Sequence, residues 1–246
     1  MVKKEIIISG LKINYLVSPG FNQDQAVVFL PGWKSPVNLF CSVMGDIPNL
    51  LAVNLPGWGG SDRPSGNWGL VEYSGFIREF LQKLGIDKPI LIGHSIGGAI
   101  AVDYLAAGGQ AKKLIIISGA IIRERSGQTR IMFVGAKIFR FLFPFINKCF
   151  RQRLAGKVLS PDYVQAGELE GTYKRLISED RKNLFTKLSL PIILIWGRND
   201  QDTPYAQAEQ LKVLQSQAIL EAVPNAGHYC FLDRPNKFRE IIFKFL

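Results

Sequence analysis

A short apolar run that leads straight into a helix pattern decides the fold of this chain: Pro89-Ile90-Leu91-Ile92-Gly93-His94-Ser95-Ile96-Gly97-Gly98-Ala99-Ile100. The run contains the spacing G-x-S-x-G, which is typical of a sharp turn between a strand and a helix. Backbone segments approach each other closely in such a turn, so that only glycine fits easily at Gly93 and Gly97. The pattern therefore predicts a nucleophile elbow, with Ser95 at its tip and backbone N–H groups of the next helix beside it.

Composition and charge limit the classes of protein to consider. The 246 residues suit one α/β domain with an insertion, and a hydrophobic content of 47% is enough for a buried core. The three cysteines are scattered and form neither a metal-binding spacing nor a disulfide framework, which favours a reducing compartment. Neither a secretory leader nor an apolar stretch of membrane-spanning length is recognisable, so we expect a cytoplasmic protein.

Short apolar runs that end in glycine-rich turns alternate with helix patterns along most of the chain. The predicted strands cover residues 5–8, 12–17, 26–30, 50–55, 90–92, 114–117, 191–196 and 218–223. The predicted helices cover residues 71–84, 96–107, 204–214 and 235–246. This alternation predicts an α/β fold with a mostly parallel sheet, helices on both faces, and a ligand site beyond the carboxyl ends of the strands.

Residues 122–185 break the alternation and contain helix patterns with little strand signal. We expect them to form a helical cap inserted between two parts of the α/β core, residues 1–121 and 186–246. Residues 123–157 contain nine basic residues and one acidic residue, or 9 − 1 = +8 of the total net charge of +10, interleaved with phenylalanines. Three interpretations stay open: solvated cations on a cap that lines the pocket, an acidic carrier protein, or an anionic membrane surface. Nucleic-acid binding is not favoured.

A serine hydroxyl needs an adjacent base to act as a nucleophile. The chain has only two histidines. His94 lies inside the elbow, and we interpret it as a packing residue whose side chain points away from the nucleophile. His228 follows the last predicted strand and is the candidate base. Asp200 and Asp202 follow the preceding strand, and Asp202 also suits the start of the next helix, so we favour Asp200 as the acid. The catalytic order along the chain is then Ser95, Asp200, His228.

Four separate segments carry a resemblance to a known family. They are Pro31-Gly32-Trp33, Leu55-Pro56-Gly57-Trp58-Gly59-Gly60-Ser61, the elbow, and the pair Gly197-x-x-Asp200-x-x-x-Pro204 and Gly227-His228. Over nearly its whole length the chain resembles the serine esterase branch of the α/β-hydrolase superfamily, in particular small carboxylesterases such as the pimeloyl-carrier-protein methyl esterases of biotin synthesis. The resemblance implies an oxyanion hole formed by the backbone N–H groups of Trp33 and Ile96, and no cofactor or metal.

The sequence departs from the family pattern at two positions. Pro31 stands where many relatives have histidine, which leaves the backbone donor of Trp33 in place. Asn54 stands where relatives often have aspartate, at a position outside the triad.

These residues predict a serine hydrolase that cleaves carboxylic esters or thioesters of an apolar acyl group through an acyl-enzyme. Its expected partner is a small-molecule acyl ester. The serine at position 95 argues against relatives that use an aspartate nucleophile. Two alternatives remain: a carbon–carbon bond hydrolase of the same fold, and a ligand-binding protein without catalytic activity.

Overall fold

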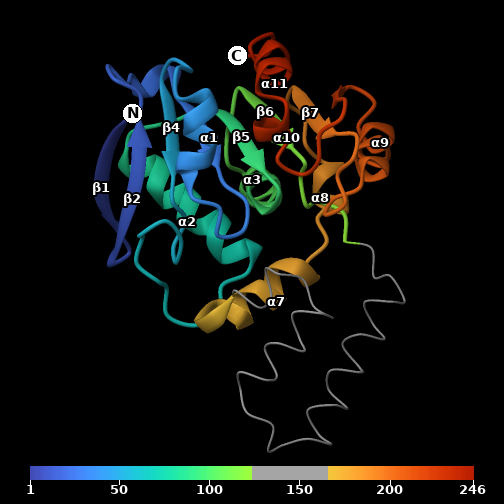
Figure 1. Cartoon of the computed structure of the whole chain (residues 1–246). Coiled ribbons are helices and arrows are strands. Elements are labelled where there is room, and N and C mark those ends of the chain that lie inside the picture. Colours follow the sequence, from blue (N-terminus) through green and yellow to red (C-terminus); the bar gives the residue numbers. More distant parts are fainter. Residues whose placement is uncertain (124–165) are drawn as a thin grey trace, which may run out of the picture.

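A computed structural model describes residues 1–123 and 166–246, and it contains one eight-stranded sheet (Figure 1). The strands are β1 (Val2–Ile8), β2 (Leu11–Val17), β3 (Val27–Leu30), β4 (Leu50–Val53), β5 (Ile90–His94), β6 (Lys113–Ile117), β7 (Ile192–Gly197) and β8 (Ile219–Val223). Their order is β1-β2-β4-β3-β5-β6-β7-β8. The strand β2 pairs antiparallel with β1 and β4, and all other pairs are parallel. The predicted α/β fold is therefore confirmed.

Helices cover both faces of the sheet (Figure 1). They are α1 (Val37–Met44), α2 (Leu70–Lys83), α3 (Ile96–Ala106), α7 (Glu170–Ser178), α8 (Lys182–Phe185), α9 (Tyr205–Leu214), α10 (Cys230–Asp233) and α11 (Pro235–Ile242), with short 3-10 turns η1 (Gln23–Gln25) and η2 (Gly167–Leu169). Apolar residues of α2, α3 and α9 pack on one face. Those of α1, α10 and α11 pack on the other. Every residue of β3, β4 and β7 is buried, as expected for strands covered on both sides.

Two short helices were absent from the sequence prediction. The helix α1 begins directly after Pro36, and its first N–H group donates to the side-chain oxygen of Asn54 at 3.4 Å. The helix α10 is separated from α11 by Arg234, whose φ of −136° and ψ of 63° lie outside the helical region, as expected for a residue that precedes a proline. The last helix begins at Pro235, where the sequence predicts it, and ends at Ile242, four residues before the predicted end.

The predicted cap falls largely on residues 124–165, which lie outside the described residues. The described part of the predicted cap includes η2, α7 and α8. Apart from Arg123, all the basic residues counted between 123 and 157 also lie outside, so the three interpretations of that charge remain predictions. Across residues 1–123 and 166–246, no helix has the length and apolar character needed to cross a membrane.

The described residues on either side of 124–165, which bound most of the predicted insertion, are hydrogen-bonded to each other. The Arg181 N–H donates to the carbonyl oxygen of Ile121 at 2.9 Å. The Arg123 N–H donates to the carboxylate of Asp180 at 2.7 Å. The segment 121–123 and the segment 180–181 each contribute one donor and one acceptor. These two bonds fix the two segments next to each other.

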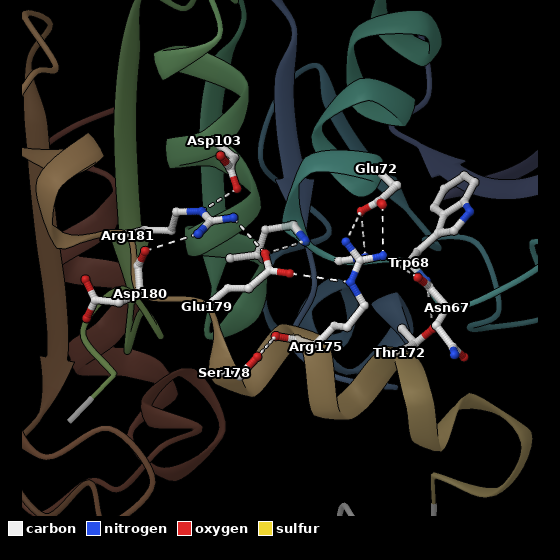
Figure 2. Close-up of polar contacts among 12 residues, drawn as sticks. Asn67, Trp68, Glu72, Asp103, Thr172, Arg175, Ser178, Glu179, Asp180 and Arg181 are labelled. Carbon is white, nitrogen blue, oxygen red and sulfur yellow. Dashed lines mark hydrogen bonds and ion pairs between the residues drawn. The ribbon is translucent and has the colours of Figure 1, made fainter. Parts of the chain in front are cut away.

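A line of alternating charges extends this connection across the core (Figure 2). Arg175 of α7 pairs with Glu72 of α2 at 2.9 Å, and lies 3.7 Å from Glu179. Arg181 pairs with Glu179 at 2.7 Å and with Asp103 of α3 at 2.5 Å. The line therefore joins α7 to the start of α2 and to α3, the helix that follows the elbow.

Candidate active site

The predicted elbow is present between β5 and α3. Ser95 has φ 53° and ψ −119°, a conformation that a non-glycine residue rarely adopts and that costs about 1–3 kcal/mol. A Cβ added to Gly93 would lie 2.6 Å from the Cα of Gly98. A Cβ added to Gly97 would lie 2.2 Å from the carbonyl oxygen of Leu30. Both glycines are therefore required by close backbone contacts, for the reason the sequence suggests.

Asp200 occupies a tight turn after β7, and its carboxylate is held by the turn itself. Its Oδ1 accepts the backbone N–H groups of Asp202 and Thr203, both at 2.9 Å. Its Oδ2 lies 2.9 Å from the Thr203 hydroxyl. The indole N–H of Trp196 donates to the Thr203 carbonyl at 2.7 Å. These bonds fix the orientation of a carboxylate whose side chain is fully buried.

His228 lies in the loop after β8, and its Nδ1 is 3.0 Å from Oδ2 of Asp200. Burial alone would raise the pKa of Asp200, but the hydrogen bond and charge of His228, with the Thr203 N–H, hold that pKa below its ordinary value. An ionised carboxylate only accepts hydrogen bonds, so Nδ1 of His228 is the protonated nitrogen. In the neutral form of this ring, Nε2 carries the lone pair that a general base requires.

The second aspartate of the turn has a different environment. Asp202 is exposed, whereas Asp200 is buried. The acidic oxygens of both and a nitrogen of His228 lie within 4.8 Å of one another. Of these two carboxylates, only that of Asp200 lies within hydrogen-bond distance of the imidazole. Because Asp200 is already engaged by the turn and by His228, the group suits proton transfer better than metal binding.

The two predicted oxyanion donors come from the loop after β3 and from the start of α3. A Cβ added to Gly32 would lie 3.2 Å from the Cβ of Ser95, so the loop after β3 passes directly beside the serine. Trp33 follows in that loop, and Ile96 is the first residue of α3. In the part of the chain that the structure describes, neither backbone N–H donates a hydrogen bond. Both donors are therefore available to a ligand oxygen.

The loop that carries Trp33 also forms an aromatic wall. The ring of Trp33 lies 5.5 Å from that of Trp58 and 5.0 Å from that of Tyr173 of α7. Trp58 in turn packs against Tyr73 of α2, whose hydroxyl donates to the carbonyl of Pro56. These contacts place large apolar groups around the oxyanion loop.

The structure joins two of the three predicted triad members directly. Asp200 and His228 are hydrogen-bonded, while no hydrogen bond joins the Ser95 hydroxyl to His228 among the described residues. In free enzymes this last contact is often long and tightens only when substrate binds. The elbow contacts His228 through the residue before Ser95, because the ring of His94 lies 4.8 Å from the ring of His228.

Sequence reasoning missed the part that Thr203 plays in the site. Its hydroxyl lies 2.9 Å from Oδ2 of Asp200, 3.3 Å from Nδ1 of His228 and 3.1 Å from the carbonyl of Ser118. The Thr203-Pro204 pair indicates only a helix start. A further signal is present in the sequence: Thr203 stands three residues after Asp200, which itself follows a strand. At this spacing an aspartate side chain can accept hydrogen bonds from the turn that follows it.

Comparison with known proteins supports this fold assignment. Residues 27–241 match the model of the "Alpha/beta hydrolase family". An AB hydrolase superfamily protein, YisY, from Bacillus subtilis is 26% identical over 242 residues, which cover 89% of this chain and 90% of that protein. A 2-hydroxy-6-oxononadienedioate/2-hydroxy-6-oxononatrienedioate hydrolase from Pseudomonas is 25% identical over 198 residues, 71% of this chain and 68% of that one. The solved structure of an esterase from Exiguobacterium antarcticum superimposes with a TM-score of 0.76, 23% identity and 99% of both chains covered.

The family match covers most of the chain and the same strands that carry the elbow, the acid turn and the histidine loop. The chain therefore belongs to the alpha/beta hydrolase family.

Proposed function

We propose that this protein is a serine hydrolase that cleaves carboxylic esters or thioesters of an apolar acyl group. The observation that supports this most is the Asp200–His228 pair at 3.0 Å, at the same sheet edge as the strained Ser95. A histidine oriented by a buried carboxylate and lying near a serine at a strand-to-helix turn is the arrangement that acyl transfer requires.

In the first half of the proposed reaction, Ser95 attacks the substrate carbonyl. Nε2 of His228 takes the serine proton, and Asp200 stabilises the resulting imidazolium through Nδ1–H. The backbone N–H groups of Trp33 and Ile96 donate to the oxyanion as charge develops on it. The imidazolium then gives its proton to the leaving alcohol or thiol, and the acyl group stays on Ser95.

In the second half, His228 removes a proton from water as the water attacks the acyl-enzyme carbonyl. His228 then gives this proton to the Ser95 oxygen as the bond to the acyl group breaks and the acid is released. The same two N–H groups stabilise the second oxyanion. The aromatic wall of Trp33, Trp58 and Tyr173 beside the oxyanion loop favours an apolar acyl group over a charged one.

The test is hydrolysis of p-nitrophenyl esters from acetate to palmitate by the wild type and by Ser95→Ala. We expect the wild type to turn over and the alanine variant to lose at least about a thousandfold in kcat. Ser42→Ala, which changes an exposed serine of α1, is the matched control and should keep the wild-type rate. Turnover that survives in Ser95→Ala would contradict the proposal.

A second candidate is a carbon–carbon bond hydrolase, which the similarity to the Pseudomonas 2-hydroxy-6-oxononadienedioate hydrolase favours. Both reactions use a serine, a base and an oxyanion hole, so the geometry alone supports both. A 2-hydroxy-6-oxo-dienoate should be offered in parallel with the esters. Turnover of the dienoate alone selects the second candidate, and tight binding without turnover of either substrate selects a binding protein.

A further inference from the structure

His94 lies between the elbow and the loop that carries His228. It is the last residue of β5, directly before Ser95, and only 1% of its surface is exposed. Its ring packs against those of Tyr229 at 4.9 Å and Phe231 at 5.3 Å, as well as against His228. On its other side, Gly32 leaves space for it, because a Cβ there would lie 2.8 Å from Nδ1 of His94.

One polar contact stands out in this packing: Nε2 of His94 lies 3.1 Å from the backbone carbonyl oxygen of His228. A carbonyl oxygen only accepts hydrogen bonds, so Nε2 must be the donor. Burial, reinforced by the neighbouring His228, lowers the pKa of His94 to about 3. The ring is therefore neutral at ordinary pH, with its single proton on Nε2 and none on Nδ1.

This proton arrangement prevents His94 from acting as a second base. Its Nε2 carries the proton and has no free lone pair. Its Nδ1 is buried and has no hydrogen-bond partner among the described residues. The bond has another consequence, since it joins the residue before the proposed nucleophile to the main chain of the proposed base. The bond therefore fixes the relative position of two segments that are 134 residues apart in the chain.

We propose that His94 is a positioning residue, whose Nε2–H bond to the His228 carbonyl sets the His228 imidazole at the correct distance from Ser95. The proposal rests on the proposed hydrolase function, because it concerns how Ser95 and His228 are aligned. Asp200 fixes the tautomer of the His228 ring, and His94 fixes the backbone that carries the ring. A displacement of about 1 Å at such a group is enough to lower a rate by about a hundredfold.

Two substitutions separate the hydrogen bond from the packing. His94→Phe keeps an aromatic ring of similar size and removes the donor. His94→Gln removes the ring and keeps an amide N–H at nearly the position of Nε2. We expect His94→Phe to lower kcat on the best ester by about ten- to a hundredfold with KM changed less than about twofold. His94→Gln should recover most of that loss.

Thermal unfolding of each variant shows whether it is folded, so that a loss of rate is not confused with a loss of structure. If the packing alone matters, His94→Gln will be the slower variant and His94→Phe the faster one, which would overturn the proposal. Equal rates for His94→Phe and the wild type would overturn it as well.

A spectroscopic measurement keeps this test independent of turnover. Because the chain has only two histidines, 15N-histidine labelling gives two rings, and the His94→Phe spectrum assigns them. We expect the His94 ring to carry its proton on Nε2 and to keep it unchanged between pH 8 and pH 5. A ring that carries its single proton on Nδ1 and none on Nε2 would exclude the hydrogen bond and overturn the proposal. A wild type that hydrolyses no substrate would contradict the proposed function. The spectrum would still show whether the His94 hydrogen bond is present.

Discussion

Oδ2 of Asp200 lies 3.0 Å from Nδ1 of His228, although the two residues are 28 positions apart and follow different strands. Asp202, two residues from Asp200, is exposed and makes no such bond among the described residues. Replacing Asp200 by Asn keeps the oxygen that accepts the Asp202 and Thr203 N–H groups, but it removes the charge that stabilises the imidazolium. We therefore expect Asp200→Asn to lower kcat/KM by at least about a hundredfold while the fold persists.

Asp202→Asn is the matched control for this prediction. It changes the same group two positions away, and its expected effect on kcat/KM is less than about threefold. Ester hydrolysis at pH 8 measures both. Equal losses in the two variants would reverse the assignment of the acid.

Much of this site could be predicted from local sequence. The elbow is encoded by glycines that close contacts require, Gly93 and Gly97, and a parallel sheet places the ends of β5, β7 and β8 at one edge. The G-x-S-x-G spacing therefore predicts the turn that carries Ser95, and the place of His228 after the last strand predicts that its loop lies at the same edge.

The remaining contacts depend on residues far apart in the chain. Nothing in the sequence near His94 specifies a carbonyl 134 residues later, and its neighbours Tyr229 and Phe231 come from α10 and the loop before it. The Arg175–Glu72 pair likewise joins positions 103 apart. Such contacts are set by tertiary packing, which is why the sequence indicates a packing role for His94 and leaves its polar partner unidentified.

Gly32 offers a test of the tight fit between the oxyanion loop and the elbow. A Cβ at this position would lie 2.8 Å from Nδ1 of His94 and 3.2 Å from the Cβ of Ser95. We expect Gly32→Ala to lower the free energy of unfolding by about 1–3 kcal/mol and to lower kcat together with it, because the loop must move away from the serine. Urea unfolding and ester hydrolysis measure the two effects.

Gly75 is the matched control, because it is exposed in the middle of α2 and a Cβ there meets nothing within 4 Å. Gly75→Ala should raise the free energy of unfolding by up to about 1 kcal/mol through helix propensity, with activity unchanged. If Gly32→Ala behaves like Gly75→Ala, the loop does not need the close approach.

The Arg181–Asp103 pair joins the segment after α7 to α3 (Figure 2). Both side chains are mostly buried, at 13% and 9% exposed. Burial raises the pKa of Asp103, and only its bonds to Arg181 oppose that effect among the described residues. Arg181→Met leaves a carboxyl buried without its partner, so we expect the free energy of unfolding to fall by about 3 kcal/mol. Denaturant unfolding at pH 8 measures it.

The double variant Arg181→Met with Asp103→Asn should recover part of this loss, because it removes the uncompensated charge. The exposed pair of Lys237 and Glu240 on α11 is the control, and Lys237→Met should leave stability nearly unchanged. A loss in Arg181→Met as small as in Lys237→Met would show that the pair contributes little.

The burial of His94 makes the stability of the protein depend on pH in a definite direction. Its pKa is lowered from 6.5 to about 3 in the folded state, so between these values the unfolded chain binds a proton that the folded chain does not. Stability therefore rises with pH across this range and is lost as pH falls below 6.5. Between pH 6.5 and pH 5 this single group should lower the free energy of unfolding by about 2 kcal/mol.

The comparison of the wild type with His94→Phe isolates this contribution, because phenylalanine does not titrate and every other ionisable group is shared. Unfolding in urea at several pH values between 5 and 8 gives the two curves. From pH 6.5 to pH 5, the free energy of unfolding of the wild type should fall by about 2 kcal/mol relative to that of the variant. Parallel curves would mean that His94 takes up a proton as readily in the folded protein as in the unfolded chain, which would contradict the lowered pKa and the neutral buried ring.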